Sequence, residues 1–185
     1  MMQHIDVSSM LHQAVACDLY SNLVTRPTGA AVRAQIQALV GAVPDRSLTV
    51  IDFTHVQMID FSCADEVVAK LLLPYSHGEA ADDSYFIFRG LTEDHWDAVE
   101  AVLERHGLAL LVEECGGAAP RGVLSPEARA AWEAVRALGA ASVDAVAARL
   151  EVSRERAASA LATLRQQRLV MCAEGMYRMV AAARG

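Results

Sequence analysis

Two arginines, Arg154 and Arg156, stand two residues apart at the expected start of a helix, directly after a serine, Ser153, that can cap it. A helix that enters the major groove of duplex DNA contacts the bases through its N-terminal side chains. Arginine can bond twice to a guanine edge, and a hydroxyl can bond to phosphate or base. We therefore expect base contacts from the exposed N-terminal positions and backbone contacts from later ones. The candidates are Ser153, Arg154, Arg156 and Ser159 at the bases, Thr163 and Arg165 nearer the backbone, and Arg178 at an adjacent phosphate.

The charge distribution bears on this expectation. Residues 1–124 carry seven basic and seventeen acidic residues, a net charge of −10, whereas residues 125–185 carry nine basic and six acidic residues, a net +3. An acidic front half repels nucleic acid, and a mildly basic back half can bind it. Two other interpretations stay open: the asymmetry can be a fluctuation of surface charge, and the arginines can solvate a helix that pairs subunits. Glu155, between the arginines, weakens the DNA interpretation.

Hydroxyl and carboxyl groups gather in a second place, after an apolar run that ends at Phe53. Ser62, with Asp60 and Thr54, can be a phosphate acceptor or a point of contact with a protein partner; the simpler interpretation is that Asp60 and Ser62 cap the next helix. Asp52 and Asp60 resemble a carboxylate pair for acid–base work, but both fall where carboxylates commonly bind backbone N–H groups. With no nucleophile and base set in the sequence, we expect no catalytic residues and no enzyme activity.

Cofactor sites are not expected either. The histidines at positions 4, 12, 55, 77, 95 and 106 and the four scattered cysteines lack metal-ligand spacing, which predicts no metal site and reduced thiols. No glycine-rich phosphate loop is present. Arg26 and Arg33 can bind an anion, although such residues more often pair with local acids such as Asp52 or Asp60.

The elements that must position these groups alternate in the front half. Hydrophobic residues make up 54% of the chain, enough for a packed core. Apolar runs predict buried strands, periodic stripes predict helices, and mixed residues near the N-terminus predict edge strands or a hairpin. The strands are expected at 48–53, 85–88 and 108–112, and the edge strands at 4–10 and 14–22. The helices are expected at 30–40, from Ala64 until Pro74 stops it, and from Thr92 to His106-Gly107, with a turn at 25–29. This alternation is typical of a small α/β sheet domain.

The pattern changes after a Gly-, Ala- and Pro-containing segment at 115–124, which predicts a linker. Ser125-Pro126-Glu127 is a strong helix start. A second short helix is expected at 142–150, a third after Ser153, and a two-stranded hairpin at 169–180. The sequence therefore predicts domains at 1–114 and 125–185.

Both halves resemble known families. The segment Val50-Ile51-Asp52-Phe53-Thr54-His55-Val56, followed by Ile59-Asp60-Phe61-Ser62 and preceded by Arg26, Gly29 and Arg33, resembles the STAS-like branch of the anti-sigma-factor antagonist fold over about residues 18–114. The resemblance implies a protein-interaction or signal-receiving module. A Ser or Thr at this helix start is often phosphorylated in that family and commonly follows the Asp directly, whereas here Phe61 intervenes.

Residues 125–180 resemble the winged helix-turn-helix domains of MarR-like bacterial regulators. The matching positions are Val143, Val146, Ala147, Leu150, Val152-Ser153, Leu161, Leu164, Leu169 and Val170, and one departure is Arg168, where many such domains have Gly. This resemblance implies double-stranded DNA as the partner.

Together these expectations describe a cytoplasmic bacterial regulator, because the N-terminus lacks a signal-peptide pattern and no apolar run approaches the roughly 20 residues of a membrane span. It would bind DNA as a homodimer, and a signal would act through the 115–124 linker. The alternative is an adaptor without DNA binding, which would use the 54–66 surface to bind a kinase-like ATPase or a sigma regulator.

Overall fold

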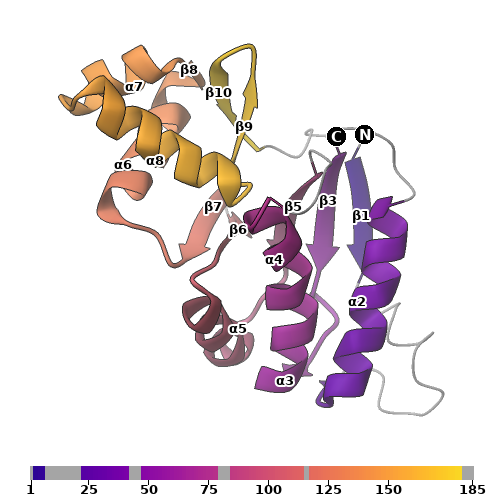
Figure 1. Cartoon of the computed structure of the whole chain (residues 1–185). Coiled ribbons are helices and arrows are strands. Elements are labelled where there is room, and N and C mark those ends of the chain that lie inside the picture. Colours follow the sequence, from indigo (N-terminus) through magenta and orange to yellow (C-terminus); the bar gives the residue numbers. More distant parts are fainter. Residues whose placement is uncertain (1, 7–21, 42–46, 79–83, 115–116, 181–185) are drawn as a thin grey trace.

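The computed structural model describes residues 2–6, 22–41, 47–78, 84–114 and 117–180 of the 185-residue chain. These residues form a mixed α/β protein (Figure 1). We call the described residues up to Gly122 the sheet unit and residues 125–180 the C-terminal unit.

The sheet unit is built on five strands in the order β1-β3-β5-β6-β7. Four are parallel: β1 (Met2–Asp6), β3 (Ser47–Asp52), β5 (Ser84–Arg89) and β6 (Ala109–Glu114). The three strands expected in the core are confirmed. β1 overlaps the start of the edge strand expected at 4–10, of which residues 7–10 lie outside the described residues. Most of the second N-terminal segment, 14–22, lies outside the described residues. A separate pair joins β2 (Asn22–Leu23) to β4 (Met58–Ile59).

Helices cover one face of this sheet (Figure 1). They are α2 (Arg26–Gly41), α3 (Phe61–Ala64), the π-helical η1 (Asp65–Ala69), α4 (Lys70–Ser76) and α5 (Glu93–His106). The turn expected at 25–29 is wrong from Arg26 onward: α2 begins there, because Pro27 is compatible with the first turn of a helix. Pro74 does not stop the next helix, which continues to Ser76.

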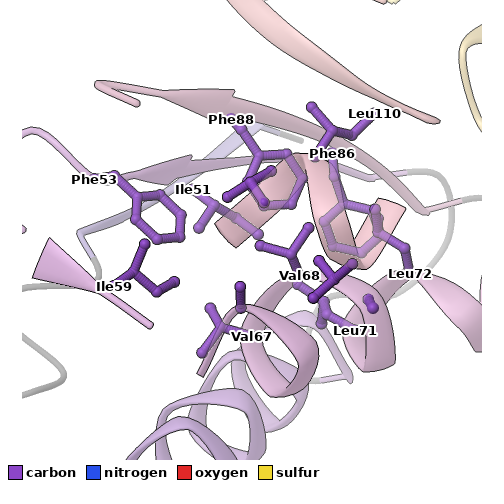
Figure 2. Packing of buried hydrophobic residues seen from close by; sticks show 14 of the residues in the cluster. Ile51, Phe53, Ile59, Val67, Val68, Leu71, Leu72, Phe86, Phe88 and Leu110 are labelled. Atoms are coloured by element: carbon purple, nitrogen blue, oxygen red, sulfur yellow. The ribbon is translucent and has the colours of Figure 1, made fainter. Parts of the chain in front are cut away.

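A hydrophobic cluster fills the space between the sheet and these helices. Alternate strand residues, among them Ile51, Phe86, Phe88 and Leu110, point toward the helical layer, where residues such as Val67, Val68 and Leu71 meet them (Figure 2). The helices also approach one another closely. A Cβ on Gly29 of α2 would lie 3.0 Å from the Cys63 Cα and 3.0 Å from the Glu66 Cβ, so glycine sets the distance between α2 and the α3–η1 segment.

The C-terminal unit contains α6 (Pro126–Leu138), β8 (Ala140–Ala141), α7 (Val143–Leu150), α8 (Arg154–Gln166), β9 (Val170–Ala173) and β10 (Met176–Met179). Its strands form an antiparallel sheet in the order β8-β10-β9. The expected helix starts are confirmed, because Ser125, Ser142 and Ser153 each accept a bond from the backbone N–H three residues later. The expected hairpin is confirmed as well, whereas β8 was not expected.

The two units share a second hydrophobic cluster. Tyr85, Ile87 and Leu111, which alternate with the residues of the first cluster, belong to one group with Trp132 and other buried residues of the C-terminal unit. Most of the predicted linker, 115–124, is not an irregular connection: residues 117–122 form β7, antiparallel to β6. Composition suggested a linker because Gly, Ala and Pro are poor strand formers, but at a sheet edge a strand can tolerate them.

Candidate functional site

Helix α8 carries most of the residues expected at a DNA surface. Its buried face consists of Ala157, Ala160, Leu161 and Leu164, which pack into the core shared with the sheet unit. The expected contact residues on the remaining helix surface, Arg154, Arg156, Ser159, Thr163 and Arg165, are all exposed, as is the cap residue Ser153. Arg178 is exposed too, on β10 of the hairpin.

The arginines do not point straight away from the core. At about 100° per residue, the direction opposite the buried face falls on Glu155, Ser159, Ala162 and Gln166. Arg154 and Arg165 lie on one flank of this outward face and Arg156 on the other. The geometry thus adds three positions that the sequence reasoning missed, Glu155, Ala162 and Gln166. The 3.6-residue period could have identified them once the buried face was known.

Both leading arginines form ion pairs with acids of neighbouring helices. Arg154 Nε lies 2.7 Å from Asp144 Oδ1 at the start of α7. Arg156 Nη2 lies 3.5 Å from Glu127 Oε1 at the start of α6. All four side chains are more than half exposed. Exposed ion pairs contribute little stability, because water solvates the separated charges well. These two ion pairs therefore hold the arginines only weakly.

Glu155 is held at the N-terminus of α8. Its own backbone N–H and the Ser153 hydroxyl bond to its carboxylate, and these bonds lower its pKa below the ordinary 4.5. The carboxylate also lies at the positive end of the helix dipole. Glu155 is therefore ionised at neutral pH and adds a negative charge at the centre of the outward face.

The second predicted site lies where β3 and β4 lead into loops and helices. Asp60 caps α3, accepting the Cys63 N–H at 2.8 Å, which confirms its expected role. The Ser62 hydroxyl donates to Asp60 Oδ1 at 2.9 Å, and the Thr54 hydroxyl donates in the same way to Asp52. Each hydroxyl is thus bonded to the carboxylate two residues before it. A phosphate on Ser62 would face the Asp60 carboxylate.

The Asp52 carboxylate also belongs to a charged row at the carboxyl ends of the strands. Arg89 of β5 binds Glu113 of β6 through two nitrogens, and its Nη1 lies 3.9 Å from Asp52 Oδ2. The hydrogen bonds that Arg89 donates to Glu113 raise the pKa of Arg89 above its ordinary value. The Asp52 carboxylate is therefore balanced by the Arg89 cation. It does not form a carboxylate pair with Asp60.

Arg26 and Arg33 pair with acids, as expected, but with other acids than the two given as examples. Arg26 Nη1 lies 2.8 Å from both Asp65 Oδ2 and Glu66 Oε1, and Arg33 Nη2 lies 3.3 Å from Glu66 Oε2, so the acids are those of η1 and not Asp52 or Asp60. Lys70 also binds Glu66. The π-helical turn places the two consecutive carboxylates, both buried, where these cations reach them.

Three exposed apolar side chains surround the capped start of α3. Val24, Met58 and Phe61 have exposed fractions of 43%, 55% and 38%. Backbone pairing brings their segments together, because Asn22 pairs with Met58 and the Asp60 N–H donates to the Leu23 carbonyl. The guanidinium of Arg105 lies 5.7 Å from the centroid of the Phe61 ring. Apolar side chains grouped on a surface are typical of contacts with other proteins.

None of the protein-family models, curated proteins or solved structures compared with this chain matches it. In the described part of the chain, no group of three or more His, Cys, Asp or Glu side chains is arranged to hold a metal ion. No helix among the same residues combines the length and apolarity needed to cross a bilayer.

Proposed function

We propose that this protein is a bacterial transcriptional regulator whose C-terminal unit binds double-stranded DNA as a winged helix-turn-helix, with α8 as the recognition helix. The observation that carries the proposal is the exposed outward face of α8, flanked by Arg154 and Arg165 on one side and Arg156 on the other. The order of elements, helix, strand, two helices and a hairpin whose last strand pairs with β8, supports the winged arrangement.

In this proposal the outward face meets base edges and the flanking cations meet phosphates. Glu155 can accept a bond from cytosine, while Ala162 can contact a thymine methyl group. Arg154 and Arg156 leave Asp144 and Glu127 for phosphates on either side of the groove. A homodimer would place two such helices on paired half-sites, because one helix supplies limited affinity.

The sheet unit would serve as the STAS-like signal-receiving module. Its single helical layer and mainly parallel sheet are compatible with that assignment. The cluster shared by Tyr85, Leu111 and Trp132 gives a direct mechanical connection to the C-terminal unit. A signal would therefore act through this packed contact, and the notion of a freely moving linker at 115–124 is set aside because β7 occupies 117–122.

The test is binding of the full chain to a duplex selected from a random pool, measured by fluorescence anisotropy at several salt concentrations. The double variant Arg154→Ala, Arg156→Ala should weaken binding at least tenfold, and the slope of log affinity against log salt should shrink by about two. The matched control is Arg105→Ala, Arg121→Ala, two exposed arginines of the sheet unit, which should bind as the parent does. No salt-dependent binding to any duplex would overturn the proposal.

A second candidate function is an adaptor that binds a kinase-like ATPase or a sigma regulator without DNA. The exposed group Val24, Met58 and Phe61 beside Ser62 favours it. Co-purification with such a protein, abolished by Met58→Ser together with Phe61→Ser, would support this function. Mass spectrometry would show whether the partner phosphorylates Ser62 or Thr54. Failure to capture any partner, with DNA binding intact, would reject it.

A further inference from the structure

A stripe of acidic side chains runs along the solvent side of α5. We call it the acidic stripe, and its members, all exposed, are Glu93, Asp97, Glu100 and Glu104. At about 100° per residue, the four positions fall within an arc of about 60° around the helix axis. No cation of the described residues forms an ion pair with any of them. Like charges three or four residues apart destabilise a helix, so the acidic stripe does not serve the stability of α5.

Helix α8 carries cations at a matching spacing. Arg154 and Arg165 lie on one flank of its outward face, and Glu93 and Glu104 lie on α5 with the same separation along the chain. At 1.5 Å of rise per residue, each pair spans about 16 Å along its helix axis. Glu93 and Arg154 are each the first residue of their helix. The two helices laid side by side in the same direction would therefore bring an acid to an arginine near both ends.

The first arginine of α8 already binds a carboxylate that another helix carries. Arg154 Nε lies 2.7 Å from Asp144 Oδ1 of α7, and the two side chains are 68% and 71% exposed. A pair so exposed is weak, because water solvates both charges. Guanidinium groups bind carboxylates and phosphates through the same N–H donors. A helix-borne carboxylate is thus a group that this arginine accepts as a partner in the chain itself.

The C-terminal ends of α5 and α8 adjoin within one chain. The Gln167 Nε2 donates to the Gly107 carbonyl at 3.5 Å, and these are the first residues after the two helices. Polar side chains of both helix ends, among them His106 and Gln166, line a common cavity. A two-fold axis through such a junction exchanges the two helices between copies. It would lay α5 of one copy along α8 of the other, and α8 along α5, with their C-terminal ends together.

We propose that the acidic stripe of α5 is a docking surface for α8 of a second copy of this chain, in a two-fold dimer that forms without DNA. Glu93 meets Arg154 of the second copy, and Glu104 meets its Arg165, so that each contact is made twice. The regulatory role of this dimer rests on the proposed function. The acidic stripe occupies the arginines that would bind phosphates, which makes the dimer a DNA-free form, distinct from two chains on paired half-sites.

The closing experiment measures self-association of the full chain without DNA, by sedimentation velocity over a range of chain concentrations. At low salt we expect a reversible dimer with a dissociation constant on the order of 10–100 µM, because exposed ion pairs are weak. At about 0.5 M salt the dissociation constant should rise at least tenfold, because the ions screen the charges. Anisotropy titrations with DNA use far lower chain concentrations and therefore start from the monomer.

Two charge-reversed chains test the pairing directly. Glu93→Lys with Glu104→Lys reverses the acidic stripe, and Arg154→Glu with Arg165→Glu reverses the flank of α8. Each chain alone should self-associate at least tenfold more weakly than the parent. An equimolar mixture should recover the dimer to within threefold, because every reversed face then meets a face of opposite sign. Each substitution changes the parent charge of −7 by two units, so the chains carry −3 and −11 and their overall charges repel.

A matched control separates the docking surface from net charge. Glu133→Lys with Glu174→Lys makes the same change of net charge at exposed residues outside α5, and should self-associate as the parent does. Circular dichroism establishes that all variants are folded. Should the Glu93 and Glu104 variant not fold, Asp97→Lys with Glu100→Lys replaces it.

The outcomes separate this inference from the proposed function. A chain that is monomeric at every salt concentration, a dimer that reversal of the acidic stripe leaves unchanged, or a mixture without recovery overturns the docking surface, whatever the DNA measurements show. Recovery in the mixture of a chain that binds no duplex leaves the docking surface standing and overturns the proposed function alone. If both hold, duplex with a single half-site should dissociate the dimer, and a dimer that persists in saturating duplex would overturn the regulatory role.

Discussion

The guanidinium of Arg168 lies over the ring of Tyr85, 5.8 Å from the ring centroid, and so joins the second residue after α8 to the second residue of β5. Arg168 adopts a left-handed backbone conformation with φ of 60°. Such a conformation favours glycine. The Arg168 side chain nevertheless makes a contact between the two units.

Two variants separate the backbone and side-chain effects at Arg168. Arg168→Ala removes the contact with Tyr85 and keeps the unfavourable backbone, so the free energy of unfolding should fall by about 1 kcal/mol. Arg168→Gly removes the contact but relieves the backbone, which should recover about 1 kcal/mol relative to alanine. Urea denaturation measures both. Equal stability of the two variants would show that the left-handed conformation carries no cost.

Glu155 offers a test of the outward face of α8. Replacing Glu155 with Gln removes a negative charge from the centre of the proposed interface, so affinity for random duplex should rise about threefold to tenfold at low salt. Discrimination between the selected and random duplexes should fall, because the carboxylate can accept a bond from cytosine. Anisotropy titrations with both duplexes measure the two effects. Glu100→Gln on the exposed surface of α5 is the control. If Glu100→Gln raised the DNA affinity by the same factor, the gain at Glu155 would come from the change in net charge alone.

The stability of the sheet unit should depend on acid through Asp65 and Glu66. Burial raises the pKa of each carboxyl, but hydrogen bonds from Arg26 and His106 to Asp65, and from Lys70 and Arg26 to Glu66, outweigh it. Both pKa values therefore lie below the ordinary 3.8 and 4.5. A carboxyl with a lower pKa in the folded chain stabilises it fully above the unfolded pKa and progressively less as the pH falls through the folded pKa.

We therefore expect the free energy of unfolding to be constant from about pH 7 to pH 5 with respect to these groups, and to fall below about pH 4.5. Asp65→Asn should cost about 1–3 kcal/mol at pH 7, since it weakens bonds to Arg26 and His106, and should make the acid loss shallower. Urea denaturation from pH 7 to pH 3 measures both. Asp97→Asn, exposed on α5, is the control, and an unchanged acid profile in Asp65→Asn would contradict the prediction.

Two glycines of α2 should respond in opposite directions to alanine. At Gly29 the new Cβ would meet the Cys63 backbone and the Glu66 side chain at 3.0 Å, so Gly29→Ala should lower the free energy of unfolding by about 1–3 kcal/mol. At Gly41, where no atom of the described residues lies within 4 Å of the same position, alanine should be neutral or stabilise by up to about 1 kcal/mol. Thermal and urea denaturation compare them. If Gly29→Ala left the free energy of unfolding unchanged, α2 would be able to move away from α3 at no cost in stability.

The boundaries that sequence reasoning placed best depend on neighbours along the chain. The caps at Asp60, Ser125 and Ser153 follow from side chains that bind an N–H three residues on, and the buried strands follow from short runs of apolar residues. The positions that it missed depend on distant partners. Residues 117–122 are a strand because β6 lies beside them, and helix α2 extends back to Arg26 although the local residues suggest a turn.

By itself, the sequence determined the alternation of strands and helices, the helix caps and the change of charge between the halves, because these depend on residue type and on short-range bonds. Only the tertiary structure decided that Arg26 pairs with acids 39 and 40 residues away, that Arg154 and Arg156 flank the outward face of α8, and that the units share a core and a polar cavity. Those relationships arise when segments distant in sequence pack together, and a pattern read along one segment does not contain the position of its neighbour in space.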